Sequence, residues 1–158
     1  LTRVNSDKAV LCFTATYNNL ALPGFNNLLR FIHQLREDFG HNRVIFYTHL
    51  VKTHDHQALE ILPASFAEYV SDSVAVMEQL KFHSWETDLV RRLLAHFKTP
   101  FEPARQQKAR MKFFNFFREY DRRRGTDFLA TFPEYRAFYA NCGLESKVPE
   151  VTPAPAGP

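Results

Sequence analysis

The stretch that decides the fold runs from Ala9 to Lys52 and reads AVLCFTATYNNLALPGFNNLLRFIHQLREDFGHNRVIFYTHLVK. It contains two short apolar runs, at residues 10–17 and 44–51, and both are rich in β-branched and aromatic residues. Near-continuous apolar runs of this length are typical of strands that are covered on both faces, as in a parallel sheet. We therefore predict one strand in each run.

The segment between the two runs has the pattern of an amphipathic helix. Apolar residues recur there at helical spacing, namely at Leu28, Leu29, Ile32, Leu35 and Phe39. Gly40 follows the last of them, in the position where glycine commonly ends a helix. A strand, a helix and a second strand in this order predict a right-handed βαβ unit. Two strands alone leave open edges and faces, so the unit needs further structure to complete it.

Length and composition are those of an ordinary globular protein. The 158 residues are enough for one domain with a core, and 16 phenylalanines make that core bulky. A net charge of +3 is only mildly basic and does not by itself indicate nucleic-acid binding. Two cysteines, Cys12 and Cys142, give no disulfide framework, and no apolar run reaches the roughly 18 residues of a membrane span. We expect a cytoplasmic protein without a membrane partner.

The rest of the chain is predicted to be helical. Ser65 and Glu68 form an S-x-x-E pair, which is typical of a helix start, and Ser84 can cap the next helix. We predict three parts: a strand-helix-strand part over residues 1–64, a C-terminal helical region over 65–142, and a Pro-rich disordered tail over 143–158. Because the chain begins with Leu1 rather than methionine, we interpret it as processed, trimmed or partial.

The predicted helix over residues 104–124 has the most unusual composition. Aromatic residues share one face of it, namely Phe113, Phe116, Phe117 and Tyr120, and basic residues fall largely on the other. Gly125 is expected to end the helix after the basic run 122–124. A basic face with aromatic rings can bind unpaired RNA bases. We favour the simpler interpretation, in which the rings form core and the cations are solvated.

Polar residues follow each predicted strand, at the end where parallel α/β folds gather their ligand sites. Asn18 and Asn19 follow the first strand, and we interpret them mainly as turn residues. His49, His54 and His56 lie around the end of the second strand and could supply imidazole ligands to a metal ion. Their spacing matches no zinc motif, so we predict a solvated loop and no metal site.

Common catalytic motifs are absent from the sequence. It contains no G-x-G-x-x-G and no G-x-x-x-x-G-K-[ST], so nothing indicates a Rossmann or P-loop phosphate site. It also contains no G-x-S-x-G elbow. Two cysteines are too few to hold an iron–sulfur cluster.

Three segments carry a resemblance to a known family. Residues 116–134 read FFREYDRRRGTDFLATFPE and resemble the C-terminal run F-x-E-x-D-R-R-x-G-T-x-F-L-x-T-F-P-E of twitch-domain-containing radical SAM proteins of phages and bacteria. Residues 15–20, ATYNNL, resemble the T-x-N-N-L ending of a late barrel strand in these proteins. Residues 56–63, HQALEILP, resemble the H-x-x-I-x-I-L-P segment that follows their last strand. The resemblance extends over nearly the whole chain, to about Gly143.

The resemblance implies a fold and an activity. Radical SAM enzymes resemble a partial (β/α)6 barrel whose [4Fe–4S] cluster is held by a C-x3-C-x2-C loop. This chain would match only the last two strands and the C-terminal helices, so the implied fold class is α/β, a partial (β/α) barrel followed by a helical region. The cysteine loop has no counterpart here. We therefore expect S-adenosylmethionine and [4Fe–4S] only in a full-length parent, which would modify a peptide or another large substrate. The implied cofactor-binding residues are Thr16, Asn18, Tyr47 and His49.

Three hypotheses about function remain open. In the first, the chain is the C-terminal portion of a radical SAM-like enzyme and is inactive without the N-terminal half, or another protein, that covers its first strand. From it we expect the isolated chain to dimerise or aggregate through that strand edge. In the second, it is a non-catalytic binding or structural module with a Phe-rich docking surface. In the third, it is a basic RNA- or ribosome-associated protein that uses Lys112, Arg118 and the run 122–124.

Overall fold

The computed structural model describes residues 9–51 and 54–145. The protein is mixed α/β and mostly helical, and it divides into two compact units, Leu1–Phe101 (unit 1) and Glu102–Pro158 (unit 2). The sequence predicted a boundary after residue 64, which falls inside unit 1. The two divisions differ because the helices that follow residue 64 pack on the strand-helix-strand segment. Within the described residues, no helix has the length and apolarity that a membrane crossing requires.

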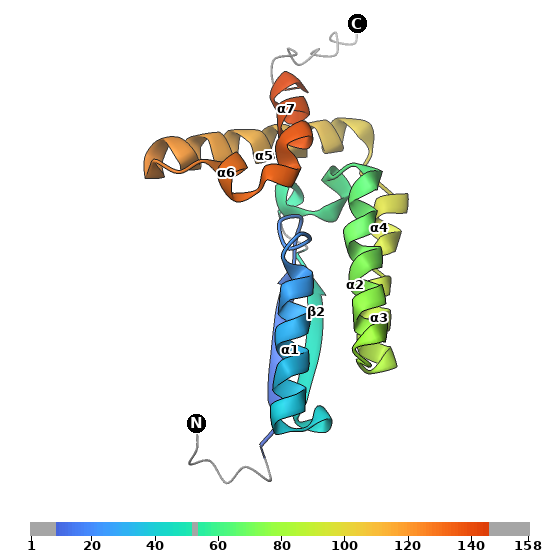
Figure 1. Ribbon diagram of the computed structural model, residues 1–158. Helices are drawn as coiled ribbons and strands as arrows, with labels where there is room; N and C mark the ends of the chain where they lie inside the picture. The colour runs from blue at the N-terminus through green and yellow to red at the C-terminus, as the bar shows by residue number, and fades with distance from the viewer. Residues whose placement is uncertain (1–8, 52–53, 146–158) are drawn as a thin grey trace, which may run out of the picture. The chain divides into compact units, whose positions relative to one another are not determined.

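Unit 1 contains a parallel sheet made, in its described part, of two strands. Strand β1 (Leu11–Tyr17) pairs with β2 (Val44–Leu50), with Leu11 opposite Val44 and Tyr17 opposite Leu50. Helix α1 (Phe25–Phe39) connects the strands and lies against one face of the sheet, in front of it in Figure 1. The predicted order of strand, helix and strand is confirmed.

Helix α1 buries a stripe that differs from the predicted one. Its buried residues are Phe25, Leu29, Ile32 and Arg36, whereas Phe39 is 60% exposed. The stripe therefore begins three residues earlier than predicted and ends on a charged residue. Gly40 ends the helix as expected, with φ at +100° and its N–H donating to the carbonyl of Arg36 at 2.8 Å.

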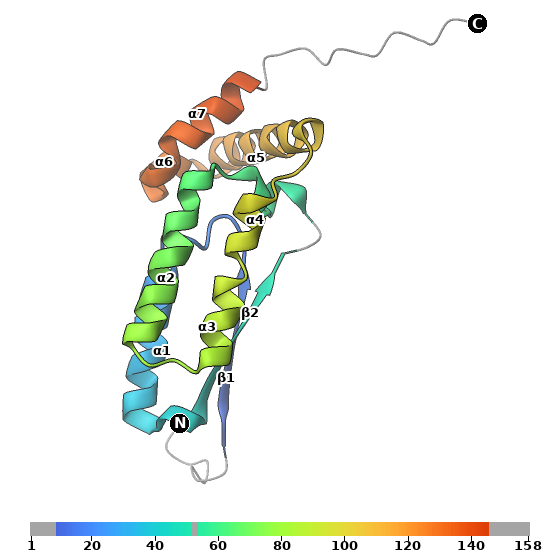
Figure 2. The ribbon, with the colours of Figure 1, turned by 90° about the vertical axis from the view of Figure 1, so that its right-hand side faces the viewer.

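Three further helices complete unit 1: α2 (Ala67–Gln79), α3 (Ser84–Arg91) and α4 (Leu94–Lys98). Short 3-10 turns connect the elements at His41–Arg43, Asp55–Gln57, Leu59–Ile61 and Ala64–Phe66. Helices α2 and α3 lie side by side (Figure 2). The predicted capping box is wrong, because Ser65 lies inside a 3-10 turn and the residue that precedes α2, Phe66, makes no side-chain cap.

Unit 2 consists of α5 (Pro103–Arg124), α6 (Phe128–Thr131), the 3-10 turn Pro133–Tyr135 and α7 (Arg136–Glu145). The carboxylate of Glu102 accepts from the first backbone N–H groups of α5, which satisfies donors that have no partner within the helix. Gly125 ends α5 in the left-handed conformation, with φ at +63°. The predicted Pro-rich tail began at residue 143, but α7 continues to Glu145, and residues 146–158 lie outside the described chain.

The core of unit 2 is aromatic, but only part of the predicted stripe belongs to it. Phe113 is fully buried, and its ring contacts those of Phe117, Phe128, Phe138 and Tyr139 at centroid distances of 4.8–6.3 Å. By contrast, two members of the predicted stripe remain about half exposed, Phe116 at 47% and Tyr120 at 46%. The prediction of a wholly buried stripe was therefore wrong for Phe116 and Tyr120.

Candidate functional site

The two faces of the β1–β2 sheet are different. The rings of Phe13 and Tyr17 contact rings of α1, at centroid distances of 6.1 Å from Phe31 and 4.5 Å from Phe25. Side chains alternate along a strand, so the residues between them, Thr14 and Thr16, point to the opposite face. Both are exposed. One face of the sheet is thus core, and the other, which we call the uncovered face, is exposed in the described part of the chain.

The uncovered face carries three of the four predicted cofactor-binding residues. The strand register pairs Thr14 with Tyr47 and Thr16 with His49, so these four side chains share the face. All four are exposed, and the Tyr47 ring lies 5.0 Å from the ring of Trp85 in α3. Hydroxyl, phenol and imidazole groups can donate and accept hydrogen bonds, so the face can bind a polar ligand.

The outer edge of β1 is open in the described chain. The carbonyl of Tyr17 accepts from the N–H of Val51, so the odd-numbered residues of β1 direct their backbone groups toward β2. The backbone groups of Cys12, Thr14 and Thr16 consequently point away from it. No other described strand pairs there. This edge has the groups needed to receive another strand.

The outer edge of β2, by contrast, is partly occupied at its start by an ion pair from two helices. Nε of Arg36 in α1 donates to the carbonyl of Val44 at 2.9 Å, and Oε1 of Glu86 in α3 accepts from the N–H of Phe46 at 2.9 Å. Nη2 of Arg36 also donates to both carboxylate oxygens of Glu86, at 2.7 and 2.9 Å. The pair therefore offers β2 one donor and one acceptor, as the backbone of a neighbouring strand would.

Both side chains of this ion pair are fully buried. The guanidinium of Arg36 lies 4.4 Å from the ring centroid of Phe82, and Oε2 of Glu86 accepts from the N–H of His83 at 3.1 Å. Nη1 of Arg36 has no hydrogen-bond partner in the described part of the chain. Sequence reasoning missed the pair. The available signal was Arg36 itself, a charge at helical spacing from Phe25, Leu29 and Ile32, which requires a buried partner.

Two titratable groups of unit 1 have altered pKa values, His41 near the ion pair and Tyr17 at the other end of the sheet. Desolvation, and then the positive charge of Arg36, lowers the pKa of His41, whose ring lies 4.5 Å from that of His83. His41 therefore stays neutral at physiological pH and adds no second cation near Arg36. Burial raises the pKa of the Tyr17 phenol, so this group remains protonated at the end of β1.

The asparagines after β1 shape the loop. Oδ1 of Asn18, the fourth predicted cofactor-binding residue, accepts from the N–H groups of Leu20 and Ala21 at 2.9 and 3.1 Å. Asn19 is buried, and its Nδ2 donates to the carbonyl of His56 at 2.9 Å. The interpretation of both as turn residues is confirmed, and Asn19 also ties this loop to the segment after β2.

Replacing Asn19 with alanine is expected to destabilise the protein by about 1–2 kcal/mol, since it removes a buried hydrogen bond to the His56 carbonyl. Urea unfolding followed by circular dichroism measures the change. The matched control is Asn27→Ala on the exposed face of α1, which is expected to change stability by less than about 0.5 kcal/mol. Equal effects of the two substitutions would contradict the structural role of Asn19.

The three histidines around the end of β2 are His49, His54 and His56. The rings of His54 and His56 are 5.7 Å apart, whereas His49 is on the uncovered face of β2. In residues 9–51 and 54–145, no three His, Cys, Asp or Glu side chains are placed to hold a metal ion. The cysteines do not fit a [4Fe–4S] cluster either, because the sequence has two, and Cys12 and Cys142 belong to different units.

Comparison with known proteins identified no matching family model, no matching curated sequence and no matching solved structure.

Proposed function

We propose that this chain is the C-terminal portion of a radical SAM-like enzyme and is inactive alone, because it cannot supply the cluster ligands. In this proposal the β1–β2 sheet is the end of a partial (β/α) barrel in the cytoplasm. The rest of the barrel, on an N-terminal half or another protein, pairs with the outer edge of β1. The parent activity is radical modification of a peptide or another large substrate.

The asymmetry of the sheet edges carries the proposal. Arg36 and Glu86 occupy the first part of the outer edge of β2, which suits a strand at the end of an open barrel. No described strand pairs with the outer edge of β1. This is what we expect of an inner strand of a barrel when the strands that precede it are not part of the chain. A two-stranded sheet that has side-chain partners at one edge and open backbone groups at the other is expected of a piece of a larger sheet.

The two faces of the sheet support the same proposal. In a (β/α) barrel the helices cover the outer face of the sheet, and ligands bind at the carboxyl ends of the strands. Here α1 covers one face, and the other presents Thr16, Tyr47 and His49. We assign these three residues to contacts with S-adenosylmethionine or the substrate. Asn18 is left to shape the turn, since the Leu20 and Ala21 N–H groups already bind its side-chain oxygen.

Anaerobic purification of the protein from its own cells tests the proposal. The intact mass, the iron and acid-labile sulfide content, and the binding of S-adenosylmethionine are measured on the same sample. We expect either a chain roughly 150–200 residues longer, the size of a domain, or a stable second chain. In both cases the added part should contain C-x3-C-x2-C. A protein that begins near Leu1, lacks iron and does not bind S-adenosylmethionine would contradict the proposal.

In that purified enzyme, Thr16→Val is expected to weaken S-adenosylmethionine binding about tenfold, the effect of losing one hydrogen bond of ~1.4 kcal/mol. Equilibrium dialysis with labelled S-adenosylmethionine measures the affinity. The control is Thr48→Val, the same substitution in the neighbouring strand but on the face toward α1, and it should leave the affinity unchanged. If both variants bind as tightly as the native protein, Thr16 does not contact this ligand.

The contacts of the basic run 122–124 support the RNA hypothesis less than the sheet supports the first hypothesis. Arg122 and Arg123 both bind the carboxylate of Glu119, at 2.7 and 2.5 Å, so part of the positive charge on this face is compensated. Binding of a single-stranded RNA that decreases steeply with salt concentration would nevertheless favour this hypothesis over the first.

A further inference from the structure

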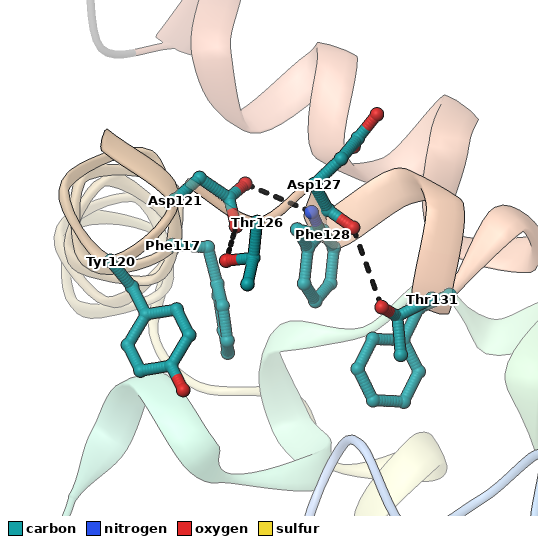
Figure 3. A pocket seen from close by; sticks show the side chains of 8 residues that line it. Phe117, Tyr120, Asp121, Thr126, Asp127, Phe128 and Thr131 are labelled. Atoms are coloured by element: carbon teal, nitrogen blue, oxygen red, sulfur yellow. Dashed lines mark hydrogen bonds between the residues drawn. The ribbon is translucent and has the colours of Figure 1, made fainter. Parts of the chain in front are cut away.

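Unit 2 contains a cleft that none of the sequence motifs predicted (Figure 3). Its volume is about 290 Å³, and it opens between the C-terminal part of α5 and α6. We call it the aromatic cleft, and define it by the residues that line it: Phe117, Tyr120, Asp121, Thr126, Asp127, Phe128, Thr131 and Phe132.

Aromatic rings form much of its surface. The ring of Phe128 lies 4.3 Å from that of Phe117 and 5.2 Å from that of Phe132, so these three rings support one another. Tyr120 is on the α5 side and is 46% exposed, which leaves its ring accessible from solvent. The faces of aromatic rings carry negative electrostatic potential and attract cations.

A carboxylate is held in place beside these rings. Oδ1 of Asp121 accepts from the hydroxyl of Thr126 at 2.8 Å, and Oδ2 accepts from the N–H of Phe128 at 2.9 Å (Figure 3). Both donors are neutral, so the bonds orient the carboxylate without cancelling its charge. Each carboxylate oxygen can accept a further hydrogen bond. Asp127 contributes a second acidic residue to the lining.

The basic residues Arg122 and Arg123 of α5 do not neutralise the acidic lining of the cleft, because they bind Glu119 instead. Arg122 and Arg123 bind Glu119, and helical geometry places these three residues on the side of α5 opposite to Phe117 and Asp121. These bonds lower the pKa of Glu119 to about 2. Among the described residues that line the cleft, none is lysine or arginine. Arg124 lies 5.8 Å from the Tyr120 ring centroid, so an arginine ligand would have to share this ring with Arg124 or displace it.

We propose that the aromatic cleft binds the arginine side chain of a peptide. A planar guanidinium stacks on aromatic rings and donates hydrogen bonds to a carboxylate, and the cleft offers both partners side by side. The volume is at the lower end of small-molecule sites, roughly 300–1,000 Å³, and suits one side chain rather than a nucleotide. The lining residues fall in the run 116–134 that carries the radical SAM resemblance, but the proposal rests only on contacts within unit 2 and can be tested without that assignment.

The test uses the 158-residue chain and three capped amino acids, N-acetyl N-methylamides of arginine, norleucine and trimethyllysine. Nuclear magnetic resonance titration measures each affinity and identifies the residues whose signals move. We expect the arginine compound to bind at least tenfold more tightly than the neutral norleucine compound, with shifts centred on the cleft. Equal affinities, or tighter binding of the trimethyllysine compound, would overturn the assignment to arginine.

Two variants and a matched control locate the binding. Asp121→Asn keeps the shape of the side chain but removes its charge, and Tyr120→Ala removes an exposed ring. Each is expected to weaken arginine binding at least tenfold. Glu119→Gln removes the same charge from the opposite side of α5 and should change the affinity less than twofold. If Glu119→Gln weakens binding as much as Asp121→Asn, only the net charge matters and the proposal fails. Should Asp121→Asn prevent folding, Tyr120→Ala decides.

Discussion

Replacing Glu86 with alanine is expected to reduce the free energy of unfolding by about 3–5 kcal/mol. The substitution leaves the guanidinium of Arg36 buried without its counter-charge, because both side chains are 0% exposed. It also removes the acceptor for the N–H of Phe46, which points away from the sheet. Breaking one side of a buried pair therefore affects the ion pair and the backbone of β2 together.

Urea unfolding followed by the fluorescence of Trp85, the one tryptophan of the sequence, measures this effect next to the altered site. The control is Glu78→Ala, which breaks the exposed Glu78–Arg91 pair and should change stability by less than about 1 kcal/mol. The double variant Arg36→Met with Glu86→Leu should be more stable than Glu86→Ala, because it leaves no uncompensated charge. If Glu86→Ala were no more destabilising than Glu78→Ala, the buried pair would not support β2.

The second large effect is expected in unit 2. Phe113→Ala should destabilise it by about 3–5 kcal/mol, because the substitution opens a cavity among the rings that Phe113 contacts. Phe116→Ala, three residues along the same helix, removes an identical side chain that is 47% exposed, and should change stability by less than about 1 kcal/mol.

Thermal unfolding followed by far-ultraviolet circular dichroism compares the two variants. The same substitution in the same helix keeps the change in helix propensity equal, so the difference between them measures burial. Similar melting temperatures for Phe113→Ala and Phe116→Ala would mean that the Phe113 ring is not central to the packing of unit 2.

The pattern of apolar residues was sufficient to predict the local elements of unit 1. Two short apolar runs and an intervening helical stripe gave β1, α1 and β2, with bounds that differ by one residue at the strand ends and by three at the start of α1. Gly40 and Gly125 marked the helix ends correctly, because glycine adopts positive φ angles without strain.

What could not be predicted depends on contacts between distant parts of the chain. Arg36 and Glu86 are 50 positions apart, and no local pattern shows that a residue at the start of α3 completes the stripe of α1. The exposure of Phe116 and Tyr120 was missed for the same reason. A helical stripe predicts one apolar face, but how far that face is covered depends on where α6 and α7 end.

The side-chain bonds at the outer edge of β2 also affect how many copies of this chain can join by pairing their strands. An ordered filament needs units that can be joined on both sides. Here Arg36 binds the Val44 carbonyl and Glu86 binds the Phe46 N–H, so another strand is disfavoured at the start of β2, and the described sheet is more readily joined through β1. Two copies that meet at β1 would each present to the outside a β2 whose first residues already have side-chain partners. Strand-to-strand association of this chain should therefore stop at a pair.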